Sequence, residues 1–371
     1  LYDESAGSDV RFYDLNSDDN LVLDGTYPTN SLFKKRIMDE QGNTTIEIRD
    51  MRGRLIQKQQ QDDSNFITTH YIYDGSGKIR AVLQPEGYKL EESIDYNSAK
   101  WNQWVFFYRY DSRGRLIEKK VPGAGLEEFV YDRWDRLVWK RTAFQTEKGK
   151  WTFMKYDALN RLIMSGDTTR SGDRPGLQTE AAAATAHHES RNTTAPVYYS
   201  LNGGYPTIPE ESIRSISYFD NYTNWPATGM GFDAGNAYHS QYANVTALPT
   251  GMRSRNGGGW LVSVNYYENK GRVIQTFAHN LYGKPERTDI QYNFVGEVLK
   301  NRYYRIDQND AATTQVLEHN YDHAGRKTKL YQSINGATSE QLALYSYDGI
   351  SRLIQKKIMP DNNYSAGGVP P

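Results

Sequence analysis

Apolar and polar residues alternate along long stretches of the chain, which is the pattern of β-strands. Residues 105–110 place Val105 and Phe107 on one face of a strand and Phe106 on the other, and the same period of two continues over residues 115–120. Such runs, rich in Tyr, Phe, Trp, Val and Ile, predict strands. Turn signals separate the runs, so we expect one hairpin to follow another.

One short phrase recurs between these strands: Tyr-Asp, two variable residues, a glycine, then a basic and an apolar residue. Recognisable copies begin at Tyr73, Tyr110, Tyr131, Tyr156, Tyr267, Tyr292, Tyr321 and Tyr347. Weaker copies begin at Met38 and Arg49. Self-similarity at intervals of roughly 20–30 residues indicates a repeat architecture, so function is sought in an assembly of units.

The phrase has the chemistry of a tight turn. An Asp followed three positions later by Gly, Asn or Asp fits a type I turn that ends in a left-handed residue. The Asp carboxylate can accept a backbone N–H bond, and the closing residue tolerates positive φ. We therefore predict structural turn residues at Asp74, Gly77, Asp111, Gly114, Asp132, Asp135, Asp157, Asn160, Gly271, Gly296, Asp322, Gly325 and Asp348. Ser351 departs from the closing pattern.

A basic residue follows most of these turns, and it could form a ladder that binds a ligand. Pairing with an acidic or Tyr neighbour on the next strand, worth up to ~1 kcal/mol per pair, is the favoured interpretation. The arginines concerned are Arg115, Arg136, Arg161, Arg272, Arg326 and Arg352.

The repeated phrases resemble the YD-repeat, or Rhs-repeat, family, and the resemblance covers roughly residues 25–358. Residues 25–55 and 264–275 further resemble the large YD-repeat proteins of Gram-negative bacteria that use the type 9 secretion system. The resemblance implies a long β-sheet that spirals into a hollow shell. In toxin members the shell encloses a carboxy-terminal toxin, which a self-cleaving core domain releases. No such domain is visible through Pro371, so neither self-cleavage nor a toxin cargo is expected of this chain.

Composition favours a thin structure. Hydrophobic residues, counted with tyrosine and without glycine, make up 37% of the 371 residues. Counting the 31 glycines in place of the 29 tyrosines leaves about the same share. Ordinary globular domains contain ~45–50% apolar residues when glycine is counted and tyrosine is not. We therefore expect a single curved sheet with one wet face rather than a solid core.

Charge and cysteine content narrow the classes of partner. The formal net charge is −1, from 44 basic and 45 acidic residues that are interspersed. This pattern gives no electrostatic footprint for nucleic acid or an anionic membrane. No apolar run approaches the ~18 residues of a membrane span. Cysteine is absent, which excludes disulfides and thiolate metal sites.

The repeats divide the chain into segments. Residues 1–24 are predicted to be a leading segment or a disordered arm, and 25–165 a YD-repeat β-sheet. Residues 166–259 contain no Tyr-Asp phrase and are interpreted as an insertion or cap, with a short helix near 179–188 and a strand at 213–218. Repeat sequence resumes over 260–358, and 359–371 form a flexible Gly/Pro tail.

No catalytic, cofactor or metal site is predicted. His187-His188-Glu189 lacks further ligands at a recognised spacing, so a solvated helix end is favoured over a metal site. The repeated Asp residues could be the paired carboxylates of a glycosidase, but each is accounted for by its turn. Packing between repeats is favoured over sugar stacking for Trp101, Trp104, Trp134, Trp139, Trp151, Trp225 and Trp260. Asp167-Thr168-Thr169 resembles an O-glycosylation acceptor of the same bacterial group, with a plain polar loop as the alternative.

The function expected from these features is a non-enzymatic scaffold, secreted or on the bacterial cell surface, that forms part of a β-shell. The alternative is the wall of a toxin-encapsulating Rhs shell, and a carbohydrate-active enzyme is a third. An open sheet leaves unpaired edges, so the ends should be covered. The expected partners are the remainder of the parent chain, secretion-channel components or a surface lipoprotein.

Overall fold

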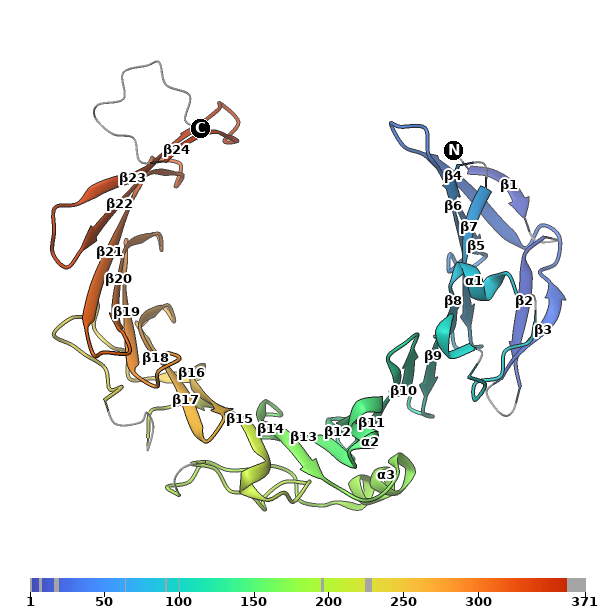
Figure 1. Ribbon diagram of the computed structural model, residues 1–371, viewed down its shortest axis with the longest axis horizontal. Coiled ribbons are helices and arrows are strands. Elements are labelled where there is room, and N and C mark those ends of the chain that lie inside the picture. The colour runs from blue at the N-terminus through green and yellow to red at the C-terminus, as the bar shows by residue number, and fades with distance from the viewer. Residues whose placement is uncertain are drawn as a thin grey trace. The chain divides into compact units, whose positions relative to one another are not determined.

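The computed structural model describes residues 2–6, 9–16, 20–63, 65–90, 92–99, 101–194, 197–223 and 229–358. The chain divides into two compact units: unit 1 is Leu1–Phe153 with Thr168–Ala184, and unit 2 is Met154–Asp167 with Thr185–Pro371. Strands dominate both units, and each strand pairs antiparallel with its neighbours (Figure 1). The predicted all-β class built from successive hairpins is therefore confirmed. No helix in the described ranges is long and apolar enough to cross a membrane.

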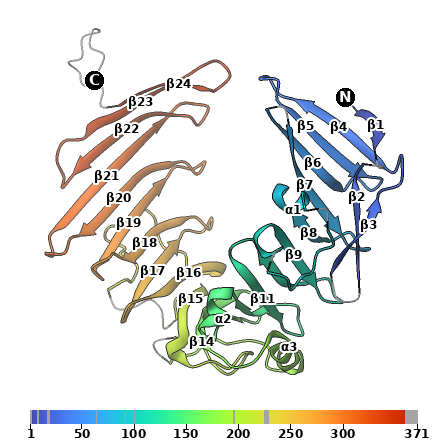
Figure 2. The same ribbon diagram turned by 45° about the vertical axis from the view of Figure 1, so that its right-hand side comes forward.

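Unit 1 is a run of hairpins in which each strand pairs with the next from β4 to β13 (Figure 2). β1 lies against β4, while β2 and β3 form a separate two-stranded ribbon. The strands are β1 (Tyr2–Ala6), β2 (Arg11–Leu15), β3 (Leu21–Thr26), β4 (Leu32–Met38), β5 (Thr44–Asp50), β6 (Leu55–Asp62), β7 (Asn65–Tyr73), β8 (Ile79–Leu83), β9 (Val105–Tyr110), β10 (Leu116–Val121), β11 (Gly125–Tyr131), β12 (Leu137–Arg141) and β13 (Lys150–Tyr156), whose last residues belong to unit 2.

Segments outside the main sheet give unit 1 a local core. The β2–β3 ribbon and the connection that contains α1 (Pro85–Tyr88) and η1 (Trp101–Gln103) pack on β7, β8 and β9. The buried side chains of this cluster are Tyr13, Leu21, Ile72, Ala81, Leu83, Ile94, Tyr96, Trp101, Val105 and Phe107. A second cluster joins Val10 to Leu32, Ile46, Ile48 and Ile56. The predicted single sheet with one solvent-exposed face therefore describes unit 1 only in part, because a covering layer buries part of that face.

Where the structure describes it, the leading segment forms strands, and this differs from the second of the two alternatives, a disordered arm. Residues 1–24 contain β1, β2 and the first part of β3. Tyr13 and Leu21 are buried in the core beneath the ribbon, so apolar side chains of β2 and β3 have partners that stabilise these strands.

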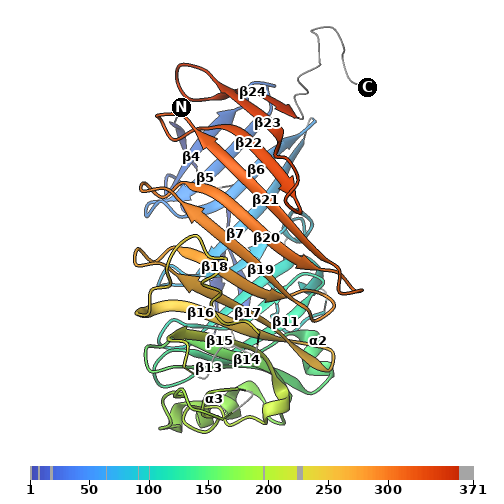
Figure 3. The same ribbon diagram turned by 90° about the vertical axis from the view of Figure 1, so that its left-hand side faces the viewer.

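Unit 2 is a second run of consecutive antiparallel pairs, from β14 to β24 (Figure 3). The strands are β14 (Leu162–Thr169), β15 (Ile213–Asp220), β16 (Val245–Asn256), β17 (Gly259–Tyr267), β18 (Val273–His279), β19 (Pro285–Tyr292), β20 (Val298–Ile306), β21 (Ala312–Tyr321), β22 (Lys327–Ile334), β23 (Glu340–Tyr347) and β24 (Leu353–Ile358). A short helix η2 (Glu210–Ser212) precedes β15.

The proposed insertion at 166–259 is interrupted by the sheet. β15 pairs with β14 and β16, and β16 pairs with β17, so two strands inside this segment continue the hairpin series. The strand expected at 213–218 corresponds to β15. The irregular parts are the connections on either side of β15.

The short helix was predicted too late in the chain. The helix α3 spans Arg174–Ala183, and Asp173 caps it by accepting a 2.9 Å bond from the Gly176 N–H. The chain beyond it is not helical, because His188 donates its backbone N–H to Gly203. A second helix, α2 (Ala143–Glu147), was not anticipated. The predicted tail at 359–371 lies outside the described residues.

Candidate functional site

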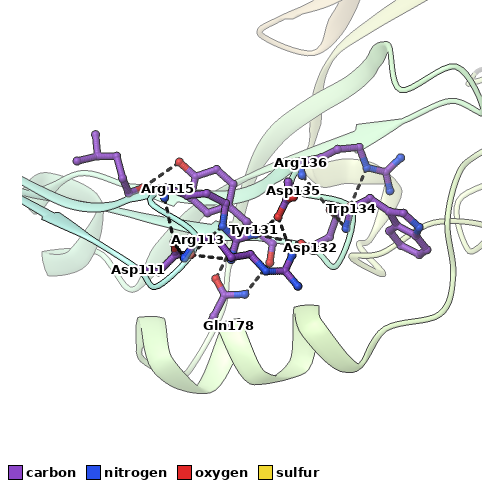
Figure 4. A network of polar contacts seen from close by, with 10 residues as sticks. Asp111, Arg113, Arg115, Tyr131, Asp132, Trp134, Asp135, Arg136 and Gln178 are labelled. Carbon is purple, nitrogen blue, oxygen red and sulfur yellow. Dashed lines mark hydrogen bonds and ion pairs between the residues drawn. The ribbon is translucent and has the colours of Figure 1, made fainter. Parts of the chain in front are cut away.

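The repeated turn is the most distinctive arrangement of charged side chains, and Asp111 shows its geometry (Figure 4). The Gly114 N–H donates to the Asp111 carbonyl at 2.8 Å, and the Asp111 N–H donates to the Arg115 carbonyl at 3.0 Å. Asp111 Oδ1 accepts from the backbone N–H groups of Arg113 and Arg115 at 3.0 and 2.9 Å. Its Oδ2 accepts from Arg115 Nε at 2.7 Å. One carboxylate therefore closes the turn and binds the basic residue that follows it.

The same set of bonds recurs in both units. In every case the Asp Oδ1 accepts backbone N–H groups two and four residues further on, and Oδ2 accepts the arginine Nε. The pairs are Asp50 with Arg54, Asp132 with Arg136, Asp157 with Arg161, Asp322 with Arg326 and Asp348 with Arg352. At Asp74 a lysine, Lys78, replaces the arginine, and its backbone N–H donates to Oδ1.

The closing residues adopt the left-handed conformation that the sequence predicts. The φ angle is 89° at Gly77, 78° at Gly114, 74° at Gly271, 101° at Gly296 and 77° at Gly325. Asp135 and Asn160 have φ of 65° and 61°, and Ser351, the departure from the pattern, has 68°. Two turns replace the leading Asp: Glu268 pairs with Arg272, and Asn293 with Glu297.

Several of the basic residues also reach the next repeat. The Arg115 guanidinium lies over the Tyr131 ring, with Cζ 4.8 Å from the ring centroid. The Tyr131 hydroxyl in turn donates to the Leu116 carbonyl at 2.9 Å. The turn is thereby tied to the strand that packs beside it, through a cation–π contact and a hydrogen bond. We call this unit of turn Asp, basic residue and following Tyr a rung.

Rungs of this kind occur along both units. A ring covers the cation in the pairs Arg54–Tyr73, Lys78–Tyr110, Arg161–Phe219, Arg272–Tyr292 and Arg326–Tyr347. The tyrosine hydroxyl donates to the carbonyl of the residue after the basic one in Tyr73–Leu55 and Tyr292–Val273. In Tyr321–Val298 it donates to the residue after Glu297, which replaces the basic residue. The predicted pairing with a Tyr on the next strand is thus present, and Arg161 also has an acidic partner on the next strand, Asp220. In every Asp–Arg turn, an additional acidic partner is the Asp of the same turn.

A second layer of contacts surrounds the Asp111 turn. Asp135 Oδ1 accepts from Arg113 Nη1 and Arg115 Nη1 at 2.8 and 2.7 Å, which links two successive turns (Figure 4). Gln178 on α3 accepts from the Tyr131 N–H at 3.1 Å and donates to the Tyr131 carbonyl at 2.7 Å. Tyr131 adjoins the bulge between β11 and β12, so a helix side chain pairs with backbone groups at this irregularity.

The pKa values of the Asp50 and Asp111 carboxyls are lowered, which favours their ionised form. Partial burial raises the pKa of the Asp111 carboxyl, but the hydrogen bonds from the Arg115 backbone and guanidinium outweigh it, and the net pKa lies below the usual range. Burial also raises the pKa of the Asp50 carboxyl. The hydrogen bonds from Arg54 outweigh this effect, so the net pKa of Asp50 is lowered as well. Such carboxylates are poor proton donors near neutral pH.

Equivalent turns at the opposite ends of the strands were not predicted. The Gly283 N–H donates to the Asn280 carbonyl at 3.0 Å, and Asn280 Oδ1 accepts from the Lys284 N–H at 3.0 Å. Asp307 repeats the pattern with Asp310 and Ala311. These turns lack the preceding Tyr, and a search for an Asp or Asn followed three residues later by Gly or Asp would have found them.

A buried ion pair in unit 2 had no signal in the sequence. Lys155 Nζ lies 2.5 Å from Glu189 Oε1, and neither side chain has exposed surface. Lys155 also donates to the carbonyls of Leu201 and Pro206, both at 2.7 Å. Burial lowers the pKa of Lys155, and the Glu189 charge opposes that effect. The pair anchors the connection before β15 to β13.

The other candidate residues take structural positions. His187 and His188 do not end a helix; their Nδ1 atoms lie 3.0 Å apart. The described residues contain no group of three or more His, Asp or Glu that could hold a metal ion. Trp101, Trp139 and Trp151 are buried, while Trp225 lies outside the described residues.

A cavity of about 230 Å³ lies beside the β2–β3 ribbon, and His70 is one of its lining residues. His70 is buried between the rings of Tyr13 and Tyr88, with centroid distances of 5.6 and 5.4 Å. Burial, together with the nearby Arg11 charge, lowers the pKa of His70 to about 3. The imidazole is therefore neutral at physiological pH.

Comparison with solved structures gives distant likenesses, and two of them are as follows. The chain is similar over 94% of its length to the crystal structure of TcdB2-TccC3-TEV, with 11% identity and a TM-score of 0.36. It is similar over 91% of its length to the crystal structure of TcdB2-TccC3-Cdc42, with 13% identity and a TM-score of 0.29. The chain spans 18% and 24% of the lengths of those chains. No family model matches the sequence, and no curated protein matches it.

Proposed function

We propose that the chain is a structural scaffold, a non-enzymatic segment of a β-shell assembled from Tyr-Asp hairpins. The observation that supports this most directly is the rung. Its carboxylate, its guanidinium and its tyrosine hydroxyl are bonded to one another or to backbone groups, as in Asp111, Arg115 and Tyr131. The charged groups that recur most often in the chain are thus used to hold adjacent strands together.

A catalytic role for the same residues would require a different geometry. Glycoside hydrolysis needs two carboxyl groups with room for a sugar between them, one of them protonated at working pH. Asp50 and Asp111 each serve a separate turn, and the pKa of each is lowered. The scaffold therefore accounts for these residues better than a carbohydrate-active enzyme does.

Placement on the cell surface or outside the cell is part of the same proposal. It follows from the resemblance of residues 25–55 and 264–275 to YD-repeat proteins exported by the type 9 system. The expected partners remain the rest of the parent polypeptide, secretion-channel components or a surface lipoprotein. Protease treatment of intact cells that carry the parent protein tests this placement: loss of the rung-bearing segment under conditions that spare a cytoplasmic marker is the expected result.

A shell wall that encloses a toxin is the alternative function, and it uses the same scaffold. The two functions differ in what the parent polypeptide carries after the repeats. A self-cleaving core followed by a variable toxin segment in the parent polypeptide would favour the toxin wall. Mass spectrometry of the purified parent protein distinguishes them, because self-cleavage yields a separate carboxy-terminal fragment.

The enzymatic alternative is tested on the purified chain itself. We expect no release of reducing sugars from a panel of bacterial and plant polysaccharides. Hydrolysis that disappears in Asp111→Asn, while circular dichroism shows an intact β fold, would overturn the scaffold proposal. The matched control is Asp310→Asn, an exposed carboxylate in a turn at the other ends of the strands.

A further inference from the structure

The last strand of unit 2, β24, differs from the other strands in its exposure. All six of its residues, Leu353–Ile358, are exposed. Among the described residues it pairs only with β23, so one of its edges carries no strand. Leu353, Ile354 and Ile358 expose 53%, 65% and 70% of their surface. An exposed edge with apolar side chains is a surface on which another strand can add.

The sequence of β24 is that of an interior strand. Residues 353–358 read Leu-Ile-Gln-Lys-Lys-Ile, and β10, residues 116–121, reads Leu-Ile-Glu-Lys-Lys-Val. β10 lies between β9 and β11, and all its residues are half-buried. Both strands follow a Tyr-Asp turn that ends in arginine. The strand that covers β10 is therefore a template for one that would cover β24.

The rung at β24 lacks its ring. Where the next tyrosine covers the arginine, the side chain is 17% exposed at Arg115, 22% at Arg272 and 26% at Arg326. Arg352 keeps its bond to Asp348, but its side chain is 75% exposed. No aromatic ring lies over it within the described part of the chain. The carbonyl that corresponds to the tyrosine acceptor Leu116 belongs to Leu353.

We propose that the free edge of β24 binds one further strand of the same repeat type. Its tyrosine stacks on the Arg352 guanidinium and donates its hydroxyl to the Leu353 carbonyl. The register of β10 with β11 pairs Lys119 with Glu127, so the added strand places an acidic residue opposite Lys356. The partner is thus a Tyr-Asp hairpin with an acidic strand. This inference rests on the scaffold function proposed above and names the partner of its unfilled rung.

The experiment appends a copy of residues 122–141, the β11–β12 hairpin with its preceding turn, to the 371-residue chain after Pro371. Tyr131 and Glu127 of the copy supply the ring and the carboxylate that the proposal requires. We expect hydrogen exchange of the β24 amides to slow by about tenfold or more, because a strand paired on both edges opens less readily. Trypsin cleavage after Arg352, Lys356 and Lys357 should slow in parallel.

Two matched extensions serve as controls. One carries Tyr131→Ala in the copy only, and the other carries the same residues in scrambled order. Protection by the native copy, reduced in the Tyr131→Ala copy and absent with the scrambled one, supports the proposal. No protection of β24 by the native copy, or equal protection by the scrambled copy, overturns it.

The unextended chain provides a check on the occupant. If its β24 amides are already protected and the protection falls on dilution together with the apparent mass in size-exclusion chromatography, a second copy of this chain covers the edge and the proposed occupant is wrong. A negative result in the extension experiment leaves the scaffold function standing, since the rungs between described strands are unaffected. Sugar hydrolysis by the purified chain would instead overturn the function without altering β24.

Discussion

The Lys155 ammonium lies 2.5 Å from Glu189 Oε1, and both side chains are fully buried. Glu189 is further bound by the backbone N–H groups of Gly203 and Gly204, at 3.0 and 3.1 Å. The connection between β14 and β15 is thus attached to the sheet through one ion pair whose other partners are mostly backbone groups.

Removing one member of this pair should lower the free energy of unfolding substantially. Lys155→Met leaves the Glu189 carboxylate buried without its counter-ion, and such losses typically destabilise a protein by ~3–5 kcal/mol. Chemical denaturation monitored by fluorescence measures the change. The matched control is Lys300→Met, which removes a lysine 2.6 Å from Glu318 at a site where both side chains are more than a third exposed. The control should lose no more than ~1 kcal/mol.

The double variant Lys155→Met with Glu189→Leu completes the test. Replacing a buried ion pair by apolar side chains of similar volume is often nearly neutral, so most of the lost stability should return. A double variant as unstable as the single one would show that the backbone bonds of Lys155 and Glu189, rather than the pairing of their charges, hold the connection in place.

A second prediction concerns the turn aspartates. Asp132 is buried, accepts from the backbone N–H groups of Trp134 and Arg136, and binds Arg136 Nε at 2.7 Å. Asp132→Ala leaves these donors unpaired in a buried site and should destabilise unit 1 by ~2–4 kcal/mol. Thermal unfolding followed by calorimetry measures the loss.

Asp348→Ala is the matched control for Asp132→Ala. Asp348 makes the same bonds, but its arginine partner is 75% exposed and water can replace the lost acceptor. Its substitution should cost ~1 kcal/mol or less. Equal losses at the two positions would contradict the view that burial of the rung sets its contribution.

The extent to which the structure can be predicted from sequence follows from how local each interaction is. The Asp111 turn involves five consecutive residues, so its carboxylate, its glycine and its arginine are visible as a phrase. The ion pair of Lys155 and Glu189 joins positions 34 residues apart through an irregular connection. The residues around Lys155 and around Glu189 form no sequence pattern that predicts it. Helix α3 lies between these cases: Ala-rich residues suggested a helix, but its start is set by the cap at Asp173 followed by Pro175.

The covering layer of unit 1 could not be inferred for a similar reason. Residues 1–24 are polar on average, and only a few side chains, such as Tyr13 and Leu21, enter the core beneath the ribbon. The average composition of the segment does not show which of its positions are buried. Their burial depends on β7, β8 and β9, which lie far along the chain.

A third prediction separates the two contacts of a rung. Tyr292→Phe keeps the ring over Arg272 but removes the hydroxyl bond to the Val273 carbonyl, 3.0 Å long. We expect a loss of ~1 kcal/mol in the free energy of unfolding. Tyr292→Ala removes both contacts and should cost a further ~1–2 kcal/mol from lost ring burial.

The control for the rung is Tyr303→Phe, on β20. Tyr303 is half-buried, and its hydroxyl makes no hydrogen bond to any other described residue. Urea denaturation should give a change below ~0.5 kcal/mol for this variant. A loss at Tyr303 as large as that at Tyr292 would mean that the hydroxyl bond to the neighbouring strand contributes little.

The last prediction is a pH dependence that originates at His70. In the folded chain the pKa of His70 is lowered to about 3 by burial and by the Arg11 charge, whereas in the unfolded chain the ordinary value is ~6.5. The unfolded state therefore binds one more proton between these two values. The stability contributed by the neutral imidazole is complete above pH ~6.5 and is lost as the pH falls toward 3, by ~1.4 kcal/mol per pH unit.

His70→Phe isolates this effect, because Phe is neutral at every pH and can occupy the space between Tyr13 and Tyr88. Urea unfolding measured from pH 7.5 to 4.5 should show a flatter slope in the variant than in the wild-type chain, by one proton per molecule. The control is His323→Ala, which removes a histidine at an exposed position in the turn after β21 and leaves the space between Tyr13 and Tyr88 unchanged. Parallel slopes for wild type and His70→Phe would show that His70 takes up a proton in the folded state, and that the cavity beside the β2–β3 ribbon admits enough water to stabilise its charge.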